Sequence, residues 1–116
     1  MPHPYDQIRD ILRKGFGLDN LRLITTHSLS ILRDDPPQHP ATLVLLAAIS
    51  RWIADAWDGV PLSVETATRV EQALAPHFQS LINVANGDLS EVCEALDAAS
   101  TAFRGVILTG LDCSLG

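Results

Sequence analysis

The chain has 116 residues, of which 47% are hydrophobic, and a formal net charge of −6 at pH 7. This length predicts a single domain with a core large enough to fold without disulfides or metals, and the hydrophobic content excludes a disordered chain. The excess of acidic groups argues against a large nucleic-acid-binding surface, because affinity for phosphates depends on clustered lysine and arginine.

The first two predicted helices cover residues 5–14 and 20–32. Apolar residues recur at helical spacing in both segments, and two glycines separate them. Asp19 supplies the short acceptor side chain that favours an N-cap before the second segment. Residues 34–40, which include three prolines, then predict a stiff, non-helical connector.

Residues 41–57 predict a helix that is apolar on almost all sides, so the rest of the chain has to cover it. Gly59 is suited to the left-handed conformation that ends such a helix. Trp52 lies on the expected core stripe, whereas Trp57 lies about 140° away around the helix and is expected at the surface. The alternative for Trp57 is that it packs beneath the proline-rich connector.

Two further helices are predicted after Ser63, which is a suitable N-cap. The first contains Pro76, so a kink or break is expected near residues 73–75. The second begins with a capping-box pattern and has the most regular apolar stripe, with more apolar surface than a small bundle needs. Its residues 106–108 could alternatively form a strand, and residues 110–116 are expected to fray.

The sequence contains no recognisable catalytic, cofactor or metal site. Its histidines lack the i, i+4 pair and the Glu-x-x-His spacing of helix-borne metal sites. They are His3, His27, His39 and His77. Paired carboxylates such as Asp55 and Asp58 fall on faces expected to be solvated, which does not favour acid–base catalysis. Cys93 is expected in the core, and Cys113 has no basic neighbour to activate it.

One part of the chain resembles the back half of phage-repressor-type helix-turn-helix domains. The resemblance rests on residues 49–52, followed by residues 59–67 and 69–74. It implies a DNA-reading helix near residues 43–52. That segment is almost wholly apolar and offers only Arg51 for contacts with bases and phosphates, and the turn glycine before it is missing. Because of the resemblance, a DNA-binding regulator with a degenerate helix-turn-helix motif is kept as an alternative function.

Charge is distributed unevenly along the chain. The first 33 residues hold five of the eight basic groups, whereas the rest of the chain holds eleven of the fourteen acidic groups. A basic front half can therefore lie against an acidic back half, within one chain or between two. The candidate contact residues from this pattern are Arg9 and Arg13 in the front half and Glu91 and Glu94 in the back half.

The sequence thus predicts an all-α protein of about five helices, packed in a compact irregular bundle around residues 41–57 and forming one domain over residues 1–116. We expect a non-catalytic interaction or regulatory protein that self-associates as a dimer, with Trp57 as an anchor, because exposed aromatic side chains are typical of interfaces. Another protein is a second candidate partner, whereas a cofactor, a nucleic acid and a membrane are not expected. Two cysteines and the lack of a signal-peptide pattern favour the cytoplasm. A helical binder of a small apolar ligand is a third functional alternative.

Overall fold

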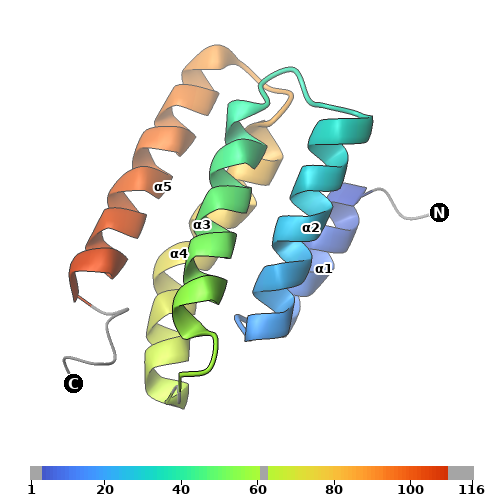
Figure 1. Cartoon of the computed structure of the whole chain (residues 1–116). Coiled ribbons are helices and arrows are strands. Elements are labelled where there is room, and N and C mark those ends of the chain that lie inside the picture. Colours follow the sequence, from blue (N-terminus) through green and yellow to red (C-terminus); the bar gives the residue numbers. More distant parts are fainter. Residues whose placement is uncertain (1–3, 61–62, 110–116) are drawn as a thin grey trace.

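A computed structural model describes residues 4–60 and 63–109 of the chain. Over these residues the chain forms five α-helices and no strand. The helices are α1 (Pro4–Lys14), α2 (Leu18–Asp34), α3 (Ala41–Trp57), α4 (Val64–Val84) and α5 (Leu89–Thr109). Figure 1 shows α5, α3 and α2 side by side in a front layer, with α4 and α1 behind them. The predicted all-α bundle is therefore confirmed.

The predicted central helix, α3, lies between α5 and α2 in the front layer, and one side of it faces solvent. α3 contacts α2, α4 and α5, and its closest packing is against α2. Its bounds, Ala41–Trp57, are those expected from the sequence. Gly59 follows with a φ of 73°, the left-handed conformation that favours glycine after a helix end. Local sequence signals therefore define both ends of this helix.

The face that α3 buries differs from the expected one. Ile49 of the expected stripe is buried, and so are Leu46 and Ile53 beside it, as expected. The buried face, however, extends to Ser50 and Trp57 and leaves Trp52 outside it. Trp57 is 3% exposed and Trp52 is 44% exposed, so the expected roles of the two tryptophans are reversed. Because α3 is apolar almost all round, its spacing does not select one face. Ser50 can lie inside because its hydroxyl donates to the Leu46 carbonyl at 2.8 Å.

α4 continues through Pro76, so the break expected near residues 73–75 is wrong, whereas a kink there stays a prediction. Pro76 has no N–H group, which leaves the Gln72 carbonyl without its helical donor. Both residues are exposed, so water can bond to that carbonyl. The opposite side of the helix keeps its core contacts through Leu74 and Phe78, which are fully buried.

Three further expectations, for the start of α2, the end of α5 and Cys93, differ from the structure or are settled by it. α2 begins directly after Gly17, which takes the N-cap position that was expected for Asp19. Residues 106–108 belong to α5, so the strand alternative is wrong. Cys93 is exposed rather than part of the core. The expected fraying concerns residues 110–116, which lie outside the described residues.

The proline-rich connector between α2 and α3 packs against the turn between α4 and α5. The Gln38 N–H donates to Asn86 Oδ1 at 2.9 Å, and the His39 N–H donates to the Ala85 carbonyl at 3.0 Å. Both bonds use backbone donors that a non-helical segment has to satisfy elsewhere. These bonds fix the start of α3 relative to the turn between α4 and α5.

The buried hydroxyl of Ser28 predicts a stabilising substitution. Ser28 is completely buried on α2, and its Oγ has no hydrogen-bond partner in the described part of the chain. A buried hydroxyl without a partner costs about 1–3 kcal/mol. We therefore expect Ser28→Ala to raise the free energy of unfolding by about 1 kcal/mol, measured by urea denaturation.

Ser50→Ala is the matched control for Ser28→Ala. Ser50 is equally buried, but its hydroxyl is bonded to the Leu46 carbonyl. The change in helix propensity is the same at both positions, so the difference between the variants reports the missing hydrogen bond. Equal changes in stability would contradict the prediction.

Candidate interaction surface

The structure does not bring the five candidate contact residues together. Trp57 is buried at the end of α3. Arg9 and Arg13 lie on α1, whereas Glu91 and Glu94 are exposed on α5. α1 and α5 do not touch over the residues that the structure describes. These basic and acidic groups therefore do not meet within the chain, and contact between two chains through them stays a prediction.

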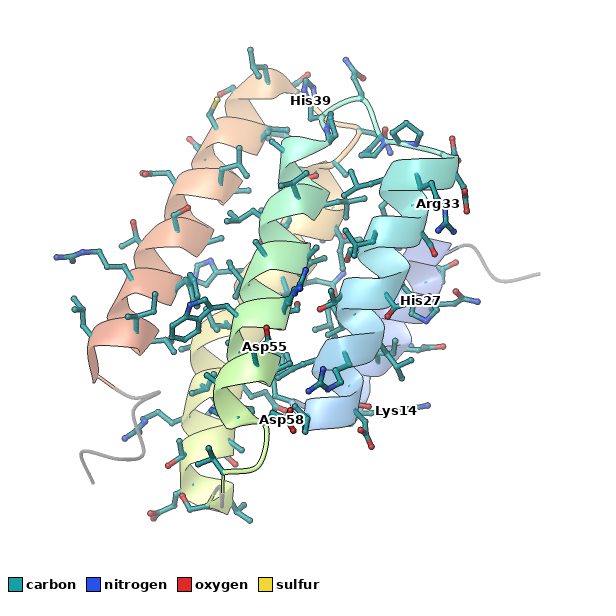
Figure 2. The ribbon with its side chains drawn as sticks, viewed as in Figure 1. Lys14, His27, Arg33, His39, Asp55 and Asp58 are labelled. Atoms are coloured by element: carbon teal, nitrogen blue, oxygen red, sulfur yellow. The ribbon has the colours of Figure 1, made fainter. Side chains whose placement is uncertain are left out.

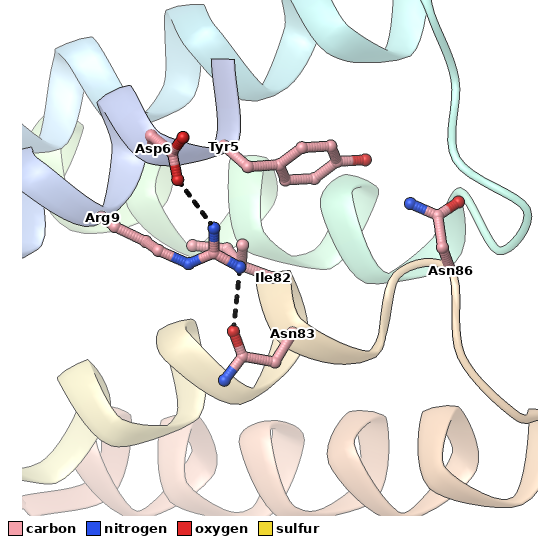
Figure 3. A pocket seen from close by; sticks show the side chains of 6 residues that line it. All are labelled: Tyr5, Asp6, Arg9, Ile82, Asn83 and Asn86. Atoms are coloured by element: carbon pink, nitrogen blue, oxygen red, sulfur yellow. Dashed lines mark hydrogen bonds and ion pairs between the residues drawn. The ribbon is translucent and has the colours of Figure 1, made fainter. Parts of the chain in front are cut away.

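Arg9 lines a polar cavity between α1 and α4, shown in Figure 3. Its guanidinium donates to Asp6 Oδ1 at 3.1 Å and to Asn83 Oδ1 at 3.0 Å. Tyr5 and Asn86 complete much of the wall of this cavity, which has a volume of about 320 Å³. Burial raises the pKa of Tyr5, and a hydrogen bond with Asn86 acts in the opposite direction. Because Arg9 already has two partners, its main effect is to hold α1 against α4.

Arg13 and Trp57 also have roles within the fold. Arg13 pairs with Asp10 at 3.0 Å on the exposed side of α1, a contact worth little in water. Trp57 does not lie beneath the connector, because α3 begins at the connector and ends at Trp57, about 24 Å further along. It lines a cavity with Phe16 and Val60 instead. Both sequence-based expectations for Trp57 are therefore wrong.

An exposed aromatic side chain lies at the junction of α3 and α5. Trp52 packs its ring against Phe103 of α5, with the ring centroids 5.5 Å apart and the planes at 83°. This edge-to-face arrangement is a favourable aromatic geometry. Nearly half of the Trp52 surface nevertheless remains exposed, so the contact joins the two helices without removing the indole from solvent.

The flank of α5 that carries Phe103 is an uncharged stripe. α5 packs mainly on α4, through a buried side that includes Val92, Ala95 and Ala99. The adjacent stripe follows helical spacing of three and four residues. Its members are Leu89, Cys93, Leu96, Ser100, Phe103 and Ile107. Several of these side chains are exposed, Leu89 and Ile107 among them, which confirms the surplus of apolar surface predicted for this helix.

The contact between Trp52 and Phe103 joins this stripe to a row of exposed uncharged residues on α3, and we name the two rows together the α3–α5 face. The α3 contribution is Val44, Ala48 and Trp52, all of them exposed. They follow one another at i, i+4 and i+8, so they lie along the same side of the helix. The α3–α5 face therefore combines uncharged positions of two neighbouring helices.

Charged side chains lie along the edges of the α3–α5 face, and Asp55 follows Ala48 by seven residues on the same side of α3. On the α2 side of α3, Arg51 and Asp55 lie 3.9 Å apart beside a shallow cavity; Figure 2 shows Asp55 on the front of the molecule. On the far side of the α5 stripe, helical spacing places Asp97 and Arg104. Each border has one positive and one negative group. This surface is therefore locally neutral in a chain whose net charge is −6.

The segment that the helix-turn-helix resemblance assigns to DNA reading, residues 43–52, lies in the middle of the bundle. It buries Leu43 and Leu46, and its arginine, Arg51, is the partner of Asp55. Its exposed positions on the α3–α5 face are apolar. These features are unlike a phosphate-binding surface, which needs clustered positive charge.

The described residues form neither a candidate metal site nor a membrane-spanning helix. No group of three histidine, cysteine or acidic side chains in residues 4–60 and 63–109 is placed to hold a metal ion. None of the helices in these ranges combines the length and apolar character that crossing a membrane requires. Comparison of the chain with protein-family models, with curated proteins and with solved structures gave no match.

Proposed function

We propose that this protein is a small non-catalytic interaction protein that forms a homodimer through the α3–α5 face. The observation that carries the proposal is the exposure of Trp52 within an uncharged strip over two neighbouring helices. Contiguous exposed apolar surface on a soluble domain is typical of protein–protein contact sites. Tryptophan is also among the residues that contribute most to binding energy at such sites.

The neutral character of the α3–α5 face permits a second copy of the chain as the partner. Two chains that each carry −6 repel one another, so association is least costly through a neutral surface. In a two-fold dimer each surface meets itself, which requires a surface that does not repel itself. The α3–α5 face meets this requirement because both of its borders contain one positive and one negative group.

The arrangement of the borders supports one particular dimer. Figure 1 shows α3 and α5 running in the same direction, and the Trp52–Phe103 contact sets their relative height. Asp55 lies three residues beyond Trp52, and Arg104 lies one residue beyond Phe103, so the two charges have similar heights. A two-fold axis parallel to these helices brings Asp55 of one chain near Arg104 of the other.

Sedimentation equilibrium at micromolar concentration tests the dimer. We expect the wild-type protein to be dimeric and Trp52→Ala to raise the dimer dissociation constant at least tenfold, about 1.4 kcal/mol or more. Leu23→Ala is the matched control, because Leu23 is 45% exposed on α2 and lies outside the α3–α5 face. A monomeric wild-type protein, or equal weakening by both substitutions, would contradict the proposal.

A charge exchange tests the proposed geometry in the same assay. Asp55→Arg places like charges opposite Arg104 across the interface and should weaken the dimer. Adding Arg104→Asp reverses both charges and should restore association toward the wild-type value. Additive weakening by the two substitutions would exclude this two-fold arrangement.

A cytoplasmic location is part of the proposal. It is supported by the small number of cysteines and by the exposed free thiol of Cys93 on the α3–α5 face. Such thiols are typical of proteins in a reducing compartment.

A further inference from the structure

We propose that Asn86 is a modification site, at which the side-chain amide is converted to a carboxylate after attack by the Gly87 main-chain nitrogen. Both residues lie in the turn between α4 and α5; Figure 3 shows Asn86 in this turn, with the Tyr5 ring pointing toward it. Asparagine followed by glycine is well suited to this reaction, because glycine has no Cβ to crowd the attacking nitrogen. The reaction consumes water and needs no enzyme, metal or oxidant.

The reaction has two steps, and its atoms balance with one molecule of water. The Gly87 nitrogen gives its proton to solvent and forms a bond to Asn86 Cγ, and the Cγ–Nδ2 bond breaks. Nδ2 takes a proton from water and leaves as ammonia, so the product of this step is a cyclic imide. Water then opens the imide at either of its carbonyl carbons, which gives aspartate or isoaspartate. In isoaspartate the main chain runs through the former side chain.

The turn does not itself require a glycine at position 87. Among the glycines that the structure describes, φ lies in the left-handed region at Gly15 and Gly59 but not at Gly87. A Cβ at Gly87 would lie 3.1 Å from Glu91 Oε2 and 3.4 Å from the Val84 carbonyl oxygen. Glu91 is exposed and can move aside. The property that glycine adds here is therefore open access to its nitrogen.

The surroundings of Asn86 differ from those of the other asparagines of the chain. Asn20 and Asn83 lie inside α2 and α4, where the next N–H group is held in the helix and the next residue is leucine or valine. Asn86 is exposed, so water can enter and ammonia can leave. Its Oδ1 accepts a hydrogen bond from the Gln38 N–H at 2.9 Å. Because negative charge develops on this oxygen during the attack, the Gln38 donor stabilises the transition state.

The proline-rich connector also controls how freely the attacking nitrogen can move. The Gly87 N–H donates to the Val84 carbonyl at 2.9 Å. The Gly87 carbonyl lies 3.1 Å from His39 Nε2, which carries the proton of this bond because a carbonyl can only accept. Attack on Cγ requires Gly87 to rotate out of these bonds. The rate therefore depends on how firmly the connector holds the turn.

Both products change the junction between the connector and the turn. Each adds a negative charge directly before Gly87 and close to Asp88 in the sequence. Isoaspartate also adds a main-chain carbon, which shifts Gly87 relative to His39. Asn86 lies outside the α3–α5 face, so this modification is independent of the proposed dimer.

Incubation of the purified full chain at neutral pH, followed by peptide mass spectrometry, tests the site. We expect the mass gain that accompanies replacement of an amide by a carboxyl group to accumulate at Asn86, with both aspartate and isoaspartate as products. Asn20 and Asn83 should remain unchanged over the same period. No gain at Asn86, or an equal gain at the three asparagines, would overturn the proposal. This comparison within one protein remains decisive if a variant does not fold.

Two pairs of variants separate the chemistry from its control by the connector. Gly87→Ala should slow the reaction at Asn86 by at least about tenfold, whereas Gly17→Ala, where a Cβ has open space, should leave the rate unchanged. His39→Ala should raise the rate by about threefold or more, because the attacking geometry is reached more often. His27→Ala removes the same side chain from α2 and should have no effect. An unchanged rate in Gly87→Ala, or equal rates in the two histidine variants, would refute the proposed attack or its control.

Discussion

Trp57→Ala should lower the free energy of unfolding by about 3–5 kcal/mol, the usual cost of removing a large aromatic side chain from a core. Trp57 is 3% exposed and belongs to the core cluster that joins α3 to its neighbours. Removal of its ring leaves a cavity in the core, because the surrounding side chains of the core cluster cannot move far enough to fill it. Urea denaturation followed by circular dichroism measures this loss.

Trp52→Ala is the informative control, because it removes the same side chain from the same helix. Trp52 is 44% exposed, and its ring packs on that of Phe103. We expect a loss of about 1 kcal/mol, measured at a protein concentration low enough to keep dimerisation from adding to the stability. A larger loss for Trp52→Ala than for Trp57→Ala would reverse the assignment of the two tryptophans.

The bounds of α3 could be predicted, but its orientation could not. Pro40 and Gly59 mark the two ends by local backbone chemistry, which depends on a few neighbouring residues only. The buried face depends on which neighbours cover the helix. With apolar side chains on nearly every side of α3, both Trp52 and Trp57 fit the core by composition. The position of Ser50 does not identify the exposed side either. Although it is polar, it lies in the core, because its hydroxyl donates a hydrogen bond within the helix.

The α5 part of the α3–α5 face could be predicted from the sequence, but the α3 part could not. The apolar stripe of α5 follows from spacing alone, and so does its surplus over what a small bundle can cover. Which members stay exposed depends on the path of α3 beside α5, and helical spacing along one segment carries no information about that path. Leu89 and Ile107 of this stripe stay exposed, and so does Cys93, which was expected in the core.

Contacts between segments that are distant along the chain could not be predicted from the sequence either. Gly15 is predicted only to end a helix, yet it also makes room for a side chain of α4. Its φ is 105°, and a Cβ there would lie 2.9 Å from Glu71 Oε1. The same oxygen accepts a hydrogen bond from the Phe16 N–H at 2.7 Å. This bond places Phe16 against α4, 55 residues away along the chain.

Phe78→Ala should be as damaging as Trp57→Ala, with a loss of about 3–5 kcal/mol in the free energy of unfolding. Phe78 is completely buried on α4, and its ring centroid lies 5.2 Å from that of Phe16, with the planes at 31°. Phe16 reaches this position from the loop between α1 and α2. The pair therefore joins the first half of the chain to the second.

A double-mutant cycle separates the contact between the two rings from the cost of each cavity. Phe16→Ala and Phe78→Ala in one chain should cost less than the sum of the single losses, by about 0.5–1.5 kcal/mol. Val106→Ala, at a buried position on α5, is the reference partner for Phe78→Ala, and the two losses should add. Equal coupling in both cycles would mean that Phe16 makes no specific contact with Phe78.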